Sequence, residues 1–209
     1  MHQRTRPRDD FGFTPREAAF FRRFTAPWRV QRYLDDMEYD PSMGTSCRSP
    51  RRVIREGKAQ CMDGALFAAA ALRFQGYPAL IVDLEAEQDT DHVLAVFRGP
   101  GGWGAVALSH FNGLRFREPI FRSIRELAVS YFEGYYNLRR EKTLRRYSQP
   151  VNLARFDERG WMTAEEDVWY IPEHLVEIRH FPVLSPAALR GVATVDKRSF
   201  DAGLLGYHH

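Results

Sequence analysis

The stretch from Glu56 to Ala65 constrains the fold most, because it places a cysteine where a loop turns into a helix. Small and apolar residues recur after it with the spacing of one buried helical face, at positions 62, 65, 66, 69 and 72. Gly76 fits the left-handed position that commonly closes a helix, and Pro78 prevents an early restart. The sequence therefore predicts a buried helix that begins at Cys61.

A cysteine at the start of a helix is well placed to act as a nucleophile. The unpaired N–H groups and the positive end of the helix dipole favour thiolate, and the same N–H groups can hold a developing oxyanion. Cys61 is therefore a candidate nucleophile, with its own backbone N–H as an oxyanion donor and the Gln60 amide as a second candidate donor. The alternatives are that Cys61 is a small buried core residue, the usual role of a free cysteine, and that Gln60 makes only a loop contact.

Composition sets the class of protein. The chain has 209 residues, of which 44% are hydrophobic and 13% aromatic, enough for one well-buried domain and too apolar for disorder. No apolar run approaches the length of a membrane-spanning helix, and the charged first ten residues lack the apolar core of a secretory signal. We expect a cytoplasmic protein with no membrane partner.

The distribution of charged residues indicates whether the protein binds nucleic acids. The net charge is only +3, and 27 of the 30 basic residues are arginines that are spread out and interleaved with acids. A nucleic-acid-binding protein usually gathers its basic residues on one face or stripe. We therefore expect solvated arginine-rich faces and no nucleic-acid partner. The sequence holds no feature that selects an oligomeric state.

The two cysteines, Cys47 and Cys61, do not form a disulfide framework. Cys47 is expected to be a buried structural residue, with a resolving thiol for an oxidised Cys61 as the alternative. The two cysteines with His92 and His110 have the residue types of a zinc site, but the paired ligand spacing typical of such sites is absent. We therefore expect no metal and no other cofactor; a redox or metal protein is the third and weakest functional class.

Local signals divide the chain into elements. Three short helices are predicted to begin at Thr14-Pro15, Ala26-Pro27 and Ser49-Pro50. Strands are predicted over 78–84, 92–97 and 103–109, the last two joined in an antiparallel hairpin by the turn at 99–102. A helix is predicted from Pro119 to about Arg140, and short strands over 168–171 and 174–178, or one extended element over both. Residues 1–12 are predicted to be a flexible tail and residues 13–209 a single domain.

The hairpin supplies a candidate base. A nucleophilic cysteine needs a base, and the base needs a third group that holds its orientation. Folding about residues 99–102 places His92, at the start of one strand, opposite Leu108 or Ser109 of the next. One residue of slip in the pairing reverses the faces, so several side chains remain candidates for the third position. These are Ser109, His110 and Asn112.

These motifs resemble those of a known family. Residues 57–65, followed by Gly76-Tyr77-Pro78-Ala79, resemble the cysteine motif of the transglutaminase-like superfamily, in which a cysteine heads a helix that ends in a Gly-x-Pro-Ala step. Residues 91–97 resemble the histidine strand of that family, and Gly102-Trp103 its following Gly-Trp strand. The resemblance covers about residues 27–115.

The resemblance implies a papain-like α+β core, with N-terminal helices packed on an antiparallel β-sheet. A long helix and an irregular C-terminal extension, over about 119–209, would complete it. It also implies that Cys61 is the nucleophile and His92 its base, acting on a peptide or small amide substrate through a thioester. The reaction would be hydrolysis, as in a peptidase or amidase, or acyl transfer to an amine, as in a transglutaminase.

The third position departs from the family pattern. The family usually has an aspartate shortly after the Gly-Trp strand begins, and none occurs between Gly104 and His110. The chain is also similar to an uncharacterised bacterial branch of the superfamily, in which an asparagine stands at the place of His110. On that basis His110 is the first choice for the third member. The missing aspartate favours the alternative function, a catalytically inactive scaffold or binding protein with the same fold.

Overall fold

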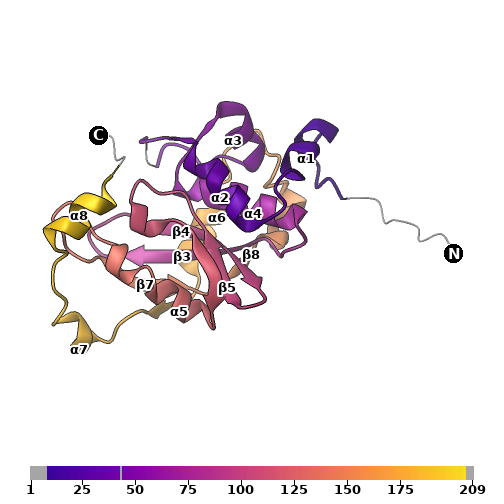
Figure 1. Cartoon of the computed structure of the whole chain (residues 1–209). Helices are drawn as coiled ribbons and strands as arrows, with labels where there is room; N and C mark the ends of the chain where they lie inside the picture. Colours follow the sequence, from indigo (N-terminus) through magenta and orange to yellow (C-terminus); the bar gives the residue numbers. More distant parts are fainter. Residues whose placement is uncertain (1–8, 43, 206–209) are drawn as a thin grey trace.

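The computed structural model describes residues 9–42 and 44–205. Its centre is an antiparallel sheet with helices on both faces (Figure 1). The strand order is β6-β5-β4-β3-β7-β9, and β8 also pairs with β3. The strands are β3 (Leu80–Ala86), β4 (His92–Gly99), β5 (Gly102–Val106), β6 (Arg117–Phe121), β7 (Leu144–Ser148), β8 (Val151–Asn152) and β9 (His180–Pro182). The chain therefore has the predicted α+β class.

Four helices precede the sheet in the chain: α1 (Pro15–Phe21), α2 (Pro27–Asp35), α3 (Pro50–Glu56) and α4 (Cys61–Phe74). The first three begin at the predicted prolines, and the side chains of Thr14 and Ser49 cap α1 and α3. Gly57 ends α3 with a φ of 70°, a left-handed conformation that glycine adopts without strain. The prediction of a helix headed by Cys61 is confirmed.

Two small elements were not predicted. The two-residue strands β1 (Glu38–Tyr39) and β2 (Lys58–Ala59) pair in parallel, and they bring the segment after α2 beside the segment that leads into α4. The remaining elements are η1 (Asn112–Leu114), α5 (Ile124–Val129), η2 (Phe132–Gly134), η3 (Leu153–Arg159), α6 (Tyr170–Glu177), α7 (Pro186–Leu189) and α8 (Lys197–Gly203).

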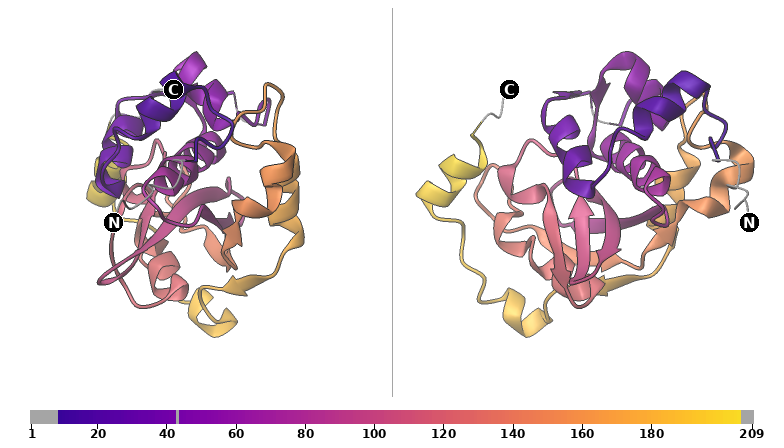
Figure 2. Two further views of the ribbon diagram at one scale, coloured as in Figure 1. Left: turned by 90° about the vertical axis from the view of Figure 1, so that its right-hand side faces the viewer. Right: turned by 45° about the vertical axis from the view of Figure 1, so that its right-hand side comes forward.

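The sheet separates two apolar cores. On one face α4 lies across the strands with α1 to α3 around it (Figure 2), and its residues 64 to 72 are buried. On the other face α5 and η2 cover the sheet through Leu127, Ala128 and Phe132. Burying an apolar layer on both faces is what makes the middle strands β3 and β4 almost continuously apolar in sequence.

The predicted helix from Pro119 to about Arg140 is wrong. That segment forms edge strand β6, the six-residue helix α5 and the 3-10 turn η2. Pro119 suits a strand at the edge of a sheet, and the Ser123 side chain caps a new start by accepting the Glu126 N–H. The helical spacing of apolar residues was genuine, since Leu127 and Ala128 do pack on the sheet, but it extends for less than two turns.

The predicted short strands over 168–171 and 174–178 are also wrong, because most of that segment is α6. Ile171 and Leu175, four residues apart, are buried on one helical side, while Val176 is 81% exposed. Packing of one helical face has overridden the strand preference of the β-branched residues.

The prediction of a flexible tail over residues 1–12 is wrong for Phe11. The Phe11 ring packs edge-on against Phe74, with ring centroids 5.1 Å apart, so residue 11 belongs to the folded body. Residues 1–8 lie outside the described residues. At the other end, α7 and α8 follow the outside of the molecule (Figure 2). None of the helices in residues 9–42 and 44–205 has the length and apolarity that a bilayer crossing requires.

Candidate active site

Cys61 is the first residue of α4, and its sulfur lies against an open edge of β4. Strand β5 pairs with β4 only from Ala95 onward, which leaves the edge of residues 91–94 unpaired by β5. The Cys61 thiol occupies this edge, with Sγ 3.9 Å from the carbonyl oxygen of Asp91. The backbone N–H groups of Val93 and Met62 also act on the sulfur, so both strand edge and helix start contribute to its surroundings.

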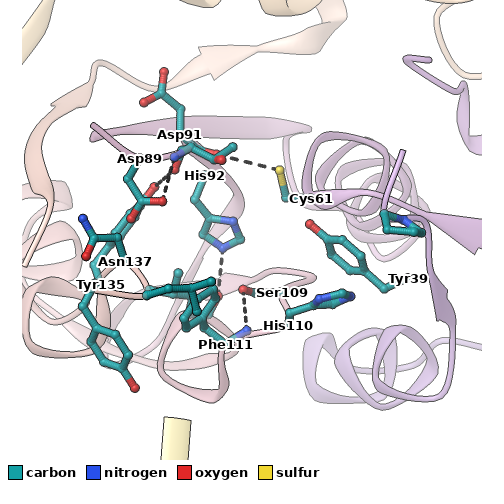
Figure 3. Close-up of a pocket in the computed structure, with 15 residues that line it drawn as sticks. Tyr39, Cys61, Asp89, Asp91, His92, Ser109, His110, Phe111, Tyr135 and Asn137 are labelled. Atoms are coloured by element: carbon teal, nitrogen blue, oxygen red, sulfur yellow. Dashed lines mark hydrogen bonds between the residues drawn. The ribbon is translucent and has the colours of Figure 1, made fainter. Parts of the chain in front are cut away.

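A cavity of about 430 Å³ opens beside the thiol (Figure 3). This volume is within the usual range of small-ligand sites. Its polar lining includes Cys61, His92, Ser109 and His110, so four of the residues singled out in the sequence share one space. Aromatic and aliphatic side chains form much of the wall, namely Tyr39, Pro41, Phe111, Leu114, Tyr135, Tyr136 and Leu138.

The His92 ring is held in one orientation by a backbone group. His92 is 4% exposed, and its Nε2 lies 2.8 Å from the carbonyl oxygen of Leu114. A carbonyl can only accept, so Nε2 carries the hydrogen and the lone pair of the neutral ring is on Nδ1. Figure 3 shows this second nitrogen on the side of the ring that faces Cys61. The Leu114 carbonyl therefore holds the His92 ring in one orientation.

Burial sets the protonation of both groups. It lowers the pKa of His92 to about 4, so the imidazole is neutral at neutral pH. It raises the pKa of the Cys61 thiol to about 11, against the N–H groups of Val93 and Met62, and the carboxylates of Asp63 and Asp83 add to the rise. The expectation that the helix start favours thiolate is therefore wrong for the resting protein. Among the described residues, no hydrogen bond joins the thiol to the imidazole, and the pair rests uncharged.

The other predicted residues are placed as follows. His110 packs against Tyr39 at the cavity wall, with ring centroids 3.6 Å apart and the ring planes tilted by 53°. Ser109 also lines the cavity, and its Oγ accepts the N–H of Phe111 at 3.1 Å. The hydrogen bond of His92 Nε2 thus goes to Leu114 and not to either of these side chains.

Asn112 and Gln60 do not line the cavity. The Asn112 amide donates to the carbonyl oxygens of Ala202 and Leu205, which ties it to the end of α8. The buried Gln60 amide donates to the carbonyl oxygen of Ser42 at 2.9 Å, which matches its interpretation as a loop contact. The backbone N–H of Cys61 stays the candidate oxyanion donor, because the first helical residues have no intrahelical acceptor.

Gln31, which was not predicted as a site residue, holds the main chain just after β5. The pairing of Ala95 with Val106, continued along the strands, would set Ser109 opposite His92, as the hairpin argument expects. However, the buried Gln31 amide donates to the Ala107 carbonyl at 2.9 Å and accepts the Ala107 N–H at 3.0 Å. Gln31 thus satisfies both backbone polar groups of Ala107 at the point where β5 stops pairing with β4.

A buried ion cluster holds the loop before Cys61. The Arg48 guanidinium, 6% exposed, contacts Glu56 at 2.7 Å, Asp63 at 2.9 Å and Asp40 at 2.5 Å. Asp63 also accepts the backbone N–H groups of Arg48 and Gln60, at 2.7 and 3.1 Å. One arginine therefore joins α3, the segment after β1 and the first turn of α4. It holds the loop that leads into Cys61 in place.

Cys47 has a structural setting. It is a free, buried cysteine whose N–H donates to Asp167 and whose carbonyl accepts the Val168 N–H. Burial raises the pKa of its thiol well above the usual range. Within residues 9–42 and 44–205, no three histidine, cysteine, aspartate or glutamate side chains are grouped so that they could hold a metal ion.

A scan against protein-family models found no match for this chain, and a search of the curated proteins found none either.

Proposed function

We propose that the chain is a cysteine-dependent enzyme of the transglutaminase-like type, which hydrolyses or transfers the acyl group of an amide. The observation that carries the proposal is the shared cavity: the thiol of Cys61 and the unprotonated Nδ1 of His92 face the same space, and the Leu114 carbonyl fixes the ring. The resemblance of residues 57–65 and 91–97 to the family motifs supports the same roles.

The chemistry follows from the neutral pair. As Sγ attacks the carbonyl carbon and the C–S bond forms, the thiol proton passes to His92 Nδ1. The oxyanion is held by the Cys61 N–H, and the imidazolium returns its proton to the leaving amine as the C–N bond breaks. Water or an amine then attacks the thioester and regenerates the thiol. Because the resting thiol is un-ionised, proton transfer must accompany attack, and His92 acts as a general base.

One observation supports the alternative function, a binding protein with an inactive site. No hydrogen bond joins Cys61 and His92 among the described residues, and neither a carboxylate nor an amide side chain holds the His92 ring. If this function is correct, the thiol should behave as an isolated buried cysteine.

Alkylation distinguishes the two. Iodoacetamide labelling of Cys61 is measured by peptide mass spectrometry from pH 5 to 11, with the buried Cys47 as an internal comparison. The enzyme proposal expects His92→Ala to slow labelling at least tenfold at pH 7, a conservative part of the usual general-base contribution. The two curves should converge near pH 11, where the thiol ionises without help.

His174→Ala is the matched control, because His174 lies outside the cavity and contacts Arg155. Added imidazole should restore part of the rate in His92→Ala. Equal labelling of the wild type and both variants across the pH range would reject the catalytic proposal in favour of the binding protein.

A further inference from the structure

The C-terminal helix α8, drawn in yellow in Figure 1, is attached to the turn that orients His92. The Asn112 side-chain amide donates from Nδ2 to the carbonyl oxygens of Ala202, at 2.9 Å, and Leu205, at 3.1 Å. Carbonyl groups at the end of a helix have no intrahelical donor, so Asn112 satisfies groups that would otherwise need water. Asn112 is also the first residue of the turn η1. One side chain therefore connects α8 to η1.

Tyr136 is the second attachment point of α8, and it lies in the wall of the cavity. Its hydroxyl donates to the Ser199 carbonyl at 3.1 Å, and its ring centroid lies 5.7 Å from that of Phe200. Gly203 packs so closely on this tyrosine that a Cβ atom there would lie 1.6 Å from the hydroxyl oxygen. Any larger residue at position 203 would push α8 away from the cavity wall.

These attachments distinguish α8 from the helices of the core. Of the seven residues from Lys197 to Gly203, only Gly203 is buried. Among the described residues, the hydrogen bonds that join α8 and Leu205 to other elements come from Asn112 and Tyr136. A helix with so little buried surface adds little to the stability of the core. Its attachments lie beside the active site, so its effect is expected there.

The turn η1 connects this attachment to His92. Asn112 and Leu114 are the first and last residues of the turn, and the Leu114 N–H donates to the Phe111 carbonyl at 3.0 Å. The Asn112 side chain binds α8, whereas the Leu114 carbonyl accepts the Nε2 hydrogen of His92. We infer that Asn112 is a positioning residue, which anchors η1 to α8 and thereby keeps the Leu114 carbonyl against His92. The effect on catalysis rests on the proposed function.

The middle of the turn is held separately. The Arg117 guanidinium donates to the Gly113 carbonyl at 2.7 Å, and the Gly113 backbone packs on that of Gly134, where a Cβ on Gly113 would lie 2.8 Å from the Gly134 Cα. These contacts keep η1 in place when Asn112 is changed. Loss of the Asn112 amide should therefore loosen the Leu114 carbonyl without unfolding the turn.

Nuclear magnetic resonance of the His92 ring tests the inference independently of activity. In protein labelled with 15N-histidine at pH 7, the Nε2–H of the wild type should exchange slowly with solvent, because it is buried and hydrogen-bonded. Its signal is identified by its absence in His92→Gln. Asn112→Ala should make this proton exchange about tenfold faster. Asn112→Gln, which keeps an amide donor, should recover part of the protection.

Iodoacetamide labelling of Cys61 tests the catalytic consequence. Asn112→Ala should slow labelling at pH 7 by roughly three- to tenfold, a part of the general-base contribution. It should leave the rate at pH 11 unchanged, because the thiol ionises there without a base. In a His92→Ala background the same change should have no further effect. A loss of stability alone would instead alter the rate at both pH values and in both backgrounds.

Gly203→Ala displaces α8 without altering η1 and should reproduce both effects of Asn112→Ala. Gly191→Ala is its control, because the nearest atom that a Cβ would meet there lies 3.8 Å away. Asn152→Ala is the control for Asn112→Ala, since the Asn152 side chain also binds a backbone group but lies outside the cavity. Both controls should match the wild type in exchange and in labelling.

Exchange of the His92 Nε2–H at the wild-type rate in both Asn112→Ala and Gly203→Ala would overturn the inference. Failure of the catalytic proposal gives a different pattern. Faster exchange in these variants, together with a labelling rate of Cys61 that does not depend on His92, would reject the catalytic role alone and leave the positioning role in place.

Discussion

Among single residues, the site depends on how burial shifts the pKa values of Cys61 and His92. His92 has a folded-state pKa of about 4, below its ordinary value of 6.5, so between these values the folded protein binds fewer protons than the unfolded chain. The contribution of neutral His92 to stability is complete above pH 6.5 and is lost as the pH falls toward 4. The loss is roughly 3 kcal/mol.

Urea unfolding from pH 7 to pH 4 should therefore show an acid-dependent loss of stability that His92→Gln largely removes. Glutamine can still donate to the Leu114 carbonyl and does not titrate. His174→Gln is the control, since His174 is only partly buried. The idea fails if wild type and His92→Gln lose stability in parallel over this range.

The sequence allowed Cys61 and His92 to be chosen as partners, because a helix start and a strand start are local patterns. Their catalytic roles remain predictions. The group that orients His92 was not foreseeable in the same way, since a backbone carbonyl such as that of Leu114 has no residue signature. The predicted candidates, Ser109, His110 and Asn112, would act through their side chains, whereas the group that holds His92 belongs to the main chain.

Among the elements, the most important feature for the site is that β5 stops pairing with β4 at Val106. Gln31, on α2, satisfies both backbone groups of Ala107. A leucine at this position would leave a buried donor and a buried acceptor unpaired, at about 1–3 kcal/mol for each group. Gln31→Leu should thus lower the urea midpoint strongly, whereas Gln149→Leu, at an exposed glutamine, should change it little.

The same variant should also affect the site. With Ala107 released, residues 107–114 lose their anchor and the Leu114 carbonyl no longer holds His92, so Cys61 alkylation at pH 7 should slow. A variant that is destabilised but alkylates at the wild-type rate would show that Gln31 supports the fold without positioning the site.

Local signals predicted the elements that depend on local chemistry. Prolines and capping residues at Thr14 and Ser49 gave the correct helix starts, and the turn at Gly99–Gly102 gave the correct hairpin. The predictions for segments beyond residue 115 were wrong, because tertiary packing determines the secondary structure there. Strand β7, for example, contains Arg145 and Arg146, and it becomes a strand through its pairing with β3 on one side and β9 on the other.

At the scale of the whole molecule, Arg48 joins elements that are distant in the chain. Removing it leaves Asp40, Glu56 and Asp63 close together without their shared cation. Breaking a buried ion pair in this way typically costs about 3–5 kcal/mol. Arg48→Met should therefore lower the free energy of unfolding by about that amount, measured by urea denaturation.

Arg55→Met is the matched control. Arg55 also pairs with a glutamate, Glu165, but its side chain is 55% exposed, so the cost should stay below about 1 kcal/mol. Asp63→Asn added to Arg48→Met should recover part of the loss, because it removes one of the unpaired charges. Similar small losses for Arg48→Met and Arg55→Met would contradict the structural role given to the cluster.

We propose that Cys61, with His92 as its base, forms an acyl-thioester. The most direct measurement is intact-protein mass spectrometry after rapid mixing with 4-nitrophenyl acetate at pH 7. We predict one acetyl group on Cys61, absent in Cys61→Ser and formed at least tenfold more slowly in His92→Ala. Acetylation that is equally fast without His92, or that occurs elsewhere than on Cys61, would contradict these catalytic roles.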